Sequence, residues 1–182
     1  MTMNPQDIID FWYSSNMKAA WFKSTAELDD EIKLRFEAVW QSASQYELDA
    51  WMASPEGCLA LVIILDQLPL NMFRGNAKSF STEAQAVEVC LHAIEQGFDQ
   101  QLDRDQLAFL YMPLMHSEDM LHQDKAVTLY EAAGLKENLR FAEHHRAIVA
   151  RFGRFPHRNA ILGRSSTPEE LDYLSSKEAF TG

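Results

Sequence analysis

The sequence is short of cysteine and contains no long apolar segment. Only two of its 182 residues are cysteines, Cys58 and Cys90, and they lie in apolar, helix-like segments without metal-site spacing. The longest aliphatic run, Leu59 to Leu65, has seven members, whereas a membrane-spanning helix needs roughly 20 residues. We therefore predict two reduced, buried thiols and no membrane-spanning helix.

Basic residues are also scarce. The chain has 16 basic and 27 acidic residues, a formal net charge of -11, which argues against DNA or RNA as a general partner because such binding needs a basic face. The first eleven residues contain Asp7 and Asp10 but no basic residue, so we predict no targeting signal and a cytoplasmic location. A composition that is 47% hydrophobic and 24% charged is typical of a folded protein, here one domain over residues 1–182.

Helix start and stop signals recur along the chain, with apolar residues mostly three or four positions apart between them. The predicted starts are Asn4 with Pro5, Ser24 with Glu27, Ser54 with Pro55, Thr82 with Gln85, Ser117 with Glu118, and Thr167 with Pro168 and Glu170. The predicted ends are Pro69 with the segment Asn71 to Gly75, Gly97, Pro113, Gly134 and Gly153, and the tail after Ser175 is expected to fray.

The apolar run Leu59 to Leu65 has no polar side, which predicts a central helix covered all round. A buried strand is the alternative, but only residues 62–64 are β-branched and the Ser-Pro start favours a helix. Together these signals predict an all-α fold of stacked antiparallel helical hairpins.

Four polar residues follow this apolar run: Asp66, Gln67, Asn71 and Arg74. A negative charge near a helix C-terminus opposes the helix dipole, so Asp66 is expected to have a cationic partner. One interpretation is a buried Asp–Arg pair that holds two helices together, and the other is a functional carboxylate. Asp66, Asn71 and Arg74 are therefore candidate ligand-binding residues.

A second polar group, His116, Glu118 and Asp119, lies at a predicted helix start. Acidic residues there complement the helix dipole without any further function. The alternative is catalysis by His116, because imidazole titrates near neutral pH and Glu118 could orient it. His144 and His145 are adjacent, so they point in different directions on a helix, and no His-Glu-x-x-His spacing occurs. We expect no bound metal and no cofactor.

The third polar group is the arginine-rich segment Arg151 to Arg164, before the last predicted helix. Residues 140–164 contain six arginines and one acid, Glu143, a net charge of +5. Because clustered arginines repel one another, negative groups should lie among them. One source is the protein's own carboxylates, including Asp66, Glu118 and Asp119. The other is a phosphate or carboxylate ligand bound by guanidinium groups. The candidate ligand-binding residues are Arg151, Arg154, Arg158, Asn159 and Arg164, and His157 is a candidate for catalysis.

The three polar groups lie within longer motifs. These are Asp66-Gln67-Leu68-Pro69 with Asn71, Phe73, Arg74 and Gly75; Tyr111-Met112-Pro113 with His116, Ser117 and Glu118; and residues 151–159 with Leu162-Gly163-Arg164 and Ser166-Thr167. Together they resemble the bacterial family catalogued as domain of unknown function 924. The resemblance implies a tetratricopeptide-like right-handed superhelix, although no repeat of about 34 residues is visible. It also implies an arginine at the position of Leu70, and it brings no established activity.

Two functional hypotheses follow from the polar groups. The first is a helical protein that binds a small anionic ligand between the first and third groups, held by Arg154, Arg158 and Arg164. His116 or His157 would titrate there, but no nucleophile is identifiable, so catalysis stays open. The second is an interaction module whose concave helical face receives an acidic peptide or a partner protein, with the arginines purely structural. A structural role in a homo-oligomer is a third possibility.

Overall fold

The protein is built from helices joined by short turns. The computed structural model describes residues 3–21 and 23–180, and within these ranges it contains no β-strand. The α-helices are α1 (Pro5–Trp12), α2 (Ser15–Lys18), α3 (Ala26–Ser44), α4 (Pro55–Val62), α5 (Leu68–Met72), α6 (Glu83–Glu95), α7 (Arg104–Leu110), α8 (Met112–His116), α9 (Met120–Ala132), α10 (Lys136–Phe152) and α11 (Pro168–Leu174). A π-helical turn, η2, spans Ile63–Gln67, and the short 3-10 helices are η1 (Asp49–Ala53), η3 (Ala77–Phe80), η4 (Asp99–Gln101) and η5 (Pro156–Arg158). The all-α prediction is confirmed for these residues.

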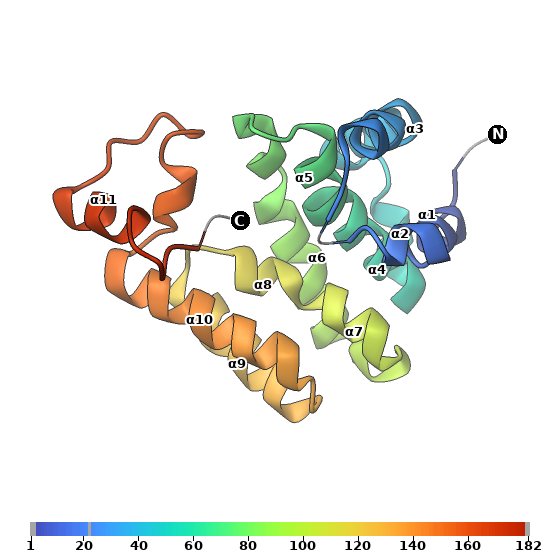
Figure 1. Ribbon diagram of the computed structural model, residues 1–182. Helices are drawn as coiled ribbons and strands as arrows, with labels where there is room; N and C mark the ends of the chain where they lie inside the picture. Colours follow the sequence, from blue (N-terminus) through green and yellow to red (C-terminus); the bar gives the residue numbers. More distant parts are fainter. Residues whose placement is uncertain (1–2, 22, 181–182) are drawn as a thin grey trace.

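The helices pack largely in the order of the chain (Figure 1). α1 packs against α4 and α3 against α5; α4 contacts α6, α6 contacts α8, and α8 contacts both α9 and α10. α9 and α10 are joined by a short link, residues 133–135, and lie side by side, so they run antiparallel. This order places α6 and α8 between the N-terminal and C-terminal helices. In the part of the chain that is described, no helix has the length and apolar character needed to cross a bilayer.

The centre of the fold is a continuous helical segment formed by α4, η2 and α5. All residues from Gly57 to Pro69 are buried, and Leu59 to Leu65 are at most 3% exposed. The predicted central helix is therefore confirmed. Cys58 and Cys90 are both free and buried, also as predicted.

The central helix ends at Met72, within the predicted segment Asn71 to Gly75, but Pro69 itself does not interrupt it, because a hydrogen bond from a distant residue compensates for the proline. A proline inside a helix has no N–H for the carbonyl four residues earlier, here that of Leu65. The hydroxyl of Thr82 donates to this carbonyl at 2.6 Å, and the helix widens into the π-helical turn just before the proline. α6 begins directly after Thr82, as predicted, but because the Thr82 hydroxyl donates to the Leu65 carbonyl, its side chain makes no capping hydrogen bond.

Glycines end three helices as predicted. Gly97, Gly134 and Gly153 follow α6, α9 and α10, with φ angles of 69°, 66° and 70°. This left-handed conformation is strained for residues that carry a Cβ atom, so glycine is the usual residue there. Pro113, by contrast, does not end a helix but stands in the first turn of α8.

Three predicted helix starts are confirmed, because the side chains of Asn4, Ser54 and Thr167 accept hydrogen bonds from backbone N–H groups of the first helical turn. Two others are shifted: Thr25 caps α3 instead of Ser24, and Asp119 caps α9 instead of Ser117. Glu118 consequently precedes α9 and does not lie in its first turn. Its side chain faces the C-terminal part of the chain instead.

The C-terminal part of the chain has a small apolar core of its own, formed by the buried residues Ile148, Val149, Phe155 and Tyr173. The tail after α11 was expected to fray, but it folds back onto this region. The backbone N–H of Phe180 donates to the Tyr173 hydroxyl at 2.9 Å. The ring centroid of Phe180 lies 4.6 Å from that of His145, so the tail covers one side of α10.

Candidate functional site

Asp66 and His116 form a pair in the interior of the fold. Asp66 lies in η2, and His116 is the last residue of α8. Both carboxylate oxygens of Asp66 lie 3.0 Å from Nδ1 of His116, and the side-chain amide of Gln67 donates to the same carboxylate. A carboxylate beside Nδ1 keeps the proton on that nitrogen and leaves Nε2 available for other partners. The expected cationic partner of Asp66 is therefore a histidine, not an arginine.

A second pair joins α6 to the arginine-rich segment. Nη1 of Arg158 donates to Oε2 of Glu83 at 2.8 Å, and the two side chains are 8% and 17% exposed. The rings of Phe80 and Phe155 lie against the guanidinium, with centroids 4.6 and 4.8 Å from Cζ. Aromatic faces attract a cation, so these rings stabilise the charge of Arg158 and fix its plane.

These two pairs, together with His157, form a set that we name the polar cluster: Asp66, Glu83, His116, His157 and Arg158. Burial raises the pKa of Glu83 to about 7, although the Arg158 guanidinium opposes this. Burial alone would lower the pKa of His116, but the neighbouring Asp66 carboxylate outweighs it and the pKa is raised. Near neutral pH the cluster thus contains a carboxyl and an imidazole that can both exchange protons.

Two histidines on the C-terminal side of the cluster are held in their neutral form. Burial lowers the pKa of His145 to about 3 and that of His157 to about 4, and the positive charges of the cluster act in the same direction. The ring of Phe180 packs against both, with centroids 4.6 and 5.1 Å away. His157 is therefore a neutral hydrogen-bonding group near pH 7.

The other arginines of the segment are paired with carboxylates of the protein. The pairs are Arg151 with Glu169, Arg154 with Glu170, and Arg164 with Glu118, at N···O distances of 3.0, 2.7 and 2.7 Å. Asn159 links the last two, since it donates to Glu170 and accepts from Arg164. An internal ion network thus occupies three of the four arginines, and only Arg158 belongs to the polar cluster.

Glu118 joins this network to the start of α9. It accepts hydrogen bonds from two nitrogens of Arg164 and from the backbone N–H of Phe155. Burial alone would raise the pKa of Glu118, but these bonds lower it. Of the other carboxylates expected in the network, Asp119 caps α9 and Asp66 binds His116. Glu118 was a candidate for orienting His116, but it binds Arg164.

Asn71 and Arg74 bind a different carboxylate, Asp29 in α3. The Asn71 amide donates at 2.7 Å and Nε of Arg74 at 2.6 Å. The Ser24 hydroxyl donates to the same side chain, which explains why it does not cap α3. Burial would raise the pKa of Asp29, but these partners lower it. The two residues therefore tie the end of α5 to the start of α3.

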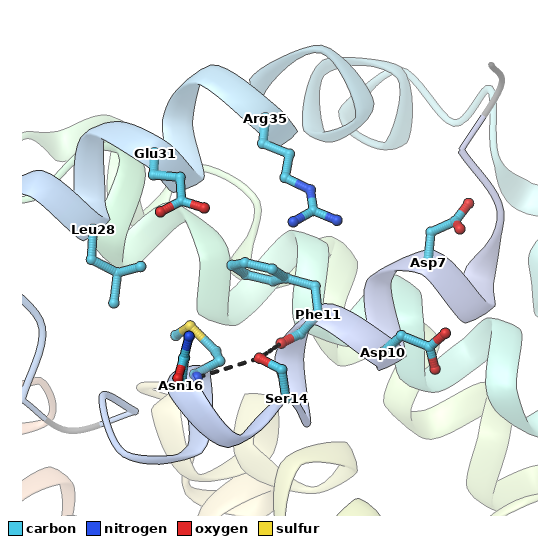
Figure 2. A pocket seen from close by; sticks show the side chains of 9 residues that line it. Asp7, Asp10, Phe11, Ser14, Asn16, Leu28, Glu31 and Arg35 are labelled. Atoms are coloured by element: carbon cyan, nitrogen blue, oxygen red, sulfur yellow. Dashed lines mark hydrogen bonds between the residues drawn. The ribbon is translucent and has the colours of Figure 1, made fainter.

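A cavity of about 440 Å³ lies between α1, α2 and α3, and Figure 2 shows its polar lining: Asp7, Asp10, Ser14, Asn16, Glu31 and Arg35. Asp7 completes the capping box of α1 and Asp10 accepts from Gln6, so both acids serve their own helix. Arg35 lies over the ring of Phe11, with Cζ 4.8 Å from its centroid. None of the sequence-predicted site residues lines this cavity.

The chain matches the sequence model of a bacterial family, described as "Bacterial protein of unknown function (DUF924)", over residues 8–178. It belongs to this family. The fold is also similar to the solved structure of ATU0120, a protein of unknown function from Agrobacterium tumefaciens, with a TM-score of 0.89 and 42% sequence identity. That match covers 94% of this chain and 96% of the other. A comparison with curated proteins gave no match. The family resemblance of the three motifs is thus confirmed.

Three residues around the cluster of this DUF924 protein were not selected from the sequence. Glu83 is the first residue of α6, where an acid is expected for the helix dipole alone, so nothing marked it out. His145 was considered only as a metal ligand, but its spacing from Ala142 and Ile148 placed it on the buried face of α10. Phe180 was missed because it lies in a tail without any periodic pattern.

Proposed function

We propose that the protein binds a small anionic ligand at the polar cluster, with Arg158 and protonated His116 as its cationic contacts. The observation that carries this proposal is a set of buried polar atoms without hydrogen-bond partners: Nε of Arg158, Oε1 of Glu83 and Nδ1 of His157. Nearly all buried polar atoms in proteins are paired, because an unpaired one costs about 1–3 kcal/mol. Three such atoms in one cluster favour a site that a guest molecule completes.

The cluster reaches the surface at two of its members. The side chains of His116 and Glu83 are 16% and 17% exposed, whereas that of Asp66 is fully buried. A ligand that approaches here meets Nε2 of His116, which has no hydrogen-bond partner among residues 3–21 and 23–180. Because Asp66 holds the opposite nitrogen, Nε2 is suited to accept or deliver a proton. The site is therefore equipped for general acid–base chemistry as well as for binding.

Small anions are expected to raise the melting temperature of the protein. A ligand that binds only the native state at ten times its Kd adds about 1.4 kcal/mol of stability, which corresponds to roughly 3–6 °C for a chain of this size. The measurement is a thermal shift series with phosphate, sulfate and small mono- and dicarboxylates at millimolar concentration, with sodium chloride at equal ionic strength as the reference.

Two histidine variants separate this site from non-specific anion binding. His116→Gln should lose most of the shift, because the anion loses a cationic contact. His144→Gln is the matched control: His144 is also on the C-terminal half but is exposed on α10, and this variant should respond like the unmodified protein. Equal shifts in all three proteins, or no shift with any anion, would contradict the proposal.

A second candidate function is recognition of an acidic peptide, which would suit a tetratricopeptide-like arrangement of the hairpins. The supporting observation is a groove of about 330 Å³ lined by Lys33, Arg74, Lys78 and Phe73. Nζ of Lys78 lies 4.2 Å from the Phe73 ring centroid, so a cation and an apolar face lie together. A Glu-rich peptide that binds the protein but not Lys78→Glu, with no response to small anions, would favour this candidate.

A further inference from the structure

The contact between Glu83 and Arg158 is incomplete on both sides. An arginine and a carboxylate can form two parallel hydrogen bonds, but this pair forms one, from Nη1 to Oε2. The second oxygen of Glu83 and Nε of Arg158 stay buried and unpaired. The two rings that lie against the guanidinium hold its plane. The pair therefore offers one free acceptor and one free donor.

A plain anion, that is, one without a hydrogen-bond donor, such as acetate, can satisfy the free donor of Arg158 but not the free acceptor of Glu83. Its oxygens can accept from Nε of Arg158 and from Nε2 of protonated His116. It has no hydrogen atom to give to Oε1 of Glu83, and it would add negative charge beside a carboxylate. A ligand that also carries a hydroxyl or ammonium group next to its anionic group would satisfy both.

We propose that the ligand of the polar cluster is a small hydroxy acid or amino acid, whose carboxylate binds Arg158 and His116 while its hydroxyl or ammonium group donates to Glu83. This inference rests on the proposed function, since it names the class of anion that the site selects. The exposed edge at Glu83 and His116 is the side from which both groups of such a ligand would enter.

Protonation of Glu83 is the competing way to satisfy the pair. With a pKa of about 7, Glu83 is partly protonated at neutral pH, and its own hydroxyl could then donate to a plain anion. The two cases separate at pH 8.5, where Glu83 is mostly ionised. At that pH a bound ligand must supply its own hydrogen-bond donor to Glu83. An anion that has no such donor can bind there only if a proton is taken up with it.

The deciding experiment compares matched acids on the unmodified protein at pH 8.5 by calorimetry: glycolate with acetate, lactate with propionate, and alanine with propionate. We expect the hydroxy and amino acids to bind about tenfold more tightly, the effect of one hydrogen bond to a charged group. Equal affinities for the members of each pair would overturn the inference and leave the proposed function intact. Absence of binding by every acid, and by phosphate, both at pH 8.5 and at pH 6, where His116 is protonated, would overturn both.

Glu83→Gln tests whether the free oxygen of Glu83 causes the preference for hydroxy acids and amino acids. The glutamine amide can keep the bond to Arg158 through its oxygen and turn its NH₂ group to the ligand, so the acceptor becomes a donor. The tenfold preference should then disappear while plain carboxylates still bind. If this variant kept the preference, Glu83 would not be the residue that recognises the hydroxyl or ammonium group. If the variant folds poorly, the comparison on the unmodified protein still decides the ligand class.

Discussion

Replacing Glu118 with alanine should lower the free energy of unfolding by about 2–4 kcal/mol. This is the cost of breaking a largely buried ion pair and of leaving the Phe155 N–H without an acceptor. Glu118 accepts two bonds from Arg164, at 2.7 and 2.9 Å, and one from the Phe155 N–H, also at 2.7 Å. Both side chains of the pair are about three-quarters buried, at 25% and 28% exposure. Without the carboxylate, the Arg164 guanidinium loses its counter-charge and keeps only its bonds to Asn159 and to the Phe155 carbonyl, while the Phe155 N–H stays in the interior with no partner. Urea unfolding at pH 7 measures the loss.

Glu169→Ala is the matched control. It also removes a carboxylate that faces an arginine of the same segment, but Arg151 and Glu169 are 50% and 64% exposed. Exposed pairs contribute about 0–1 kcal/mol, so this variant should stay close to the unmodified protein. If the two variants lost equal stability, Glu118 would not be the residue that fixes the arginine-rich segment to the fold.

The helices could be predicted from the sequence because their signals are local. Gly153 ends α10 and Thr167 caps α11 through interactions within a few residues, which a pattern can show. Pro69 failed as a stop signal because the compensation is distant. The Leu65 carbonyl that the proline leaves without a donor is served by Thr82, seventeen positions further along the chain. No local pattern contains that bond.

The polar groups show the same limit. The sequence indicated that clustered arginines need negative partners, and the structure supplies a carboxylate for each arginine of the segment. It did not indicate which carboxylates these are. Glu83 lies 75 positions from Arg158, and Asp66 lies 50 positions from His116. Such pairs depend on how α6 and α8 lie between the two ends of the chain, which no single-sequence pattern encodes.

The arrangement of charges also divides the arginine motif by role. Arg151, Arg154 and Arg164 bind carboxylates on α11 or just before α9, so they hold the C-terminal segment in place. Arg158 reaches α6 and keeps one donor unused. Of the two interpretations of this segment, an internal ion network thus describes three of its arginines, and the network positions the fourth guanidinium next to the Asp66–His116 pair.

Asp66→Asn should lower the pKa of His116, because the substitution removes the opposite charge that stabilises the protonated imidazole. The asparagine keeps the shape of the side chain but removes the charge that outweighs burial in the unmodified protein. The pKa should then fall below its ordinary value, since burial is the largest influence and the Glu83 carboxylate opposes it only in part. Titration of the histidine ring signals by NMR measures both values.

The same substitution should change how stability depends on pH. In the unmodified protein the pKa of His116 is higher in the folded chain than in the unfolded chain, so protonated His116 stabilises the fold. This contribution to the free energy of unfolding is fully present below the unfolded-state pKa and is lost as pH rises through the folded-state pKa. In Asp66→Asn the folded pKa is depressed, so protonation below the unfolded pKa favours the unfolded chain instead. The unmodified protein should therefore be more stable than Asp66→Asn by a wider margin at pH 5 than at pH 8.5.

Asp124→Asn provides the control for this pH dependence. Asp124 also pairs with a basic residue, but its partner is an arginine, Arg146, and the pair is about half exposed. Its effect on stability should be small and equal at both pH values. If Asp66→Asn behaved in the same way, with a constant difference at pH 5 and pH 8.5, then Asp66 would not hold the charged form of His116, and proton transfer at Nε2 would lose its physical basis.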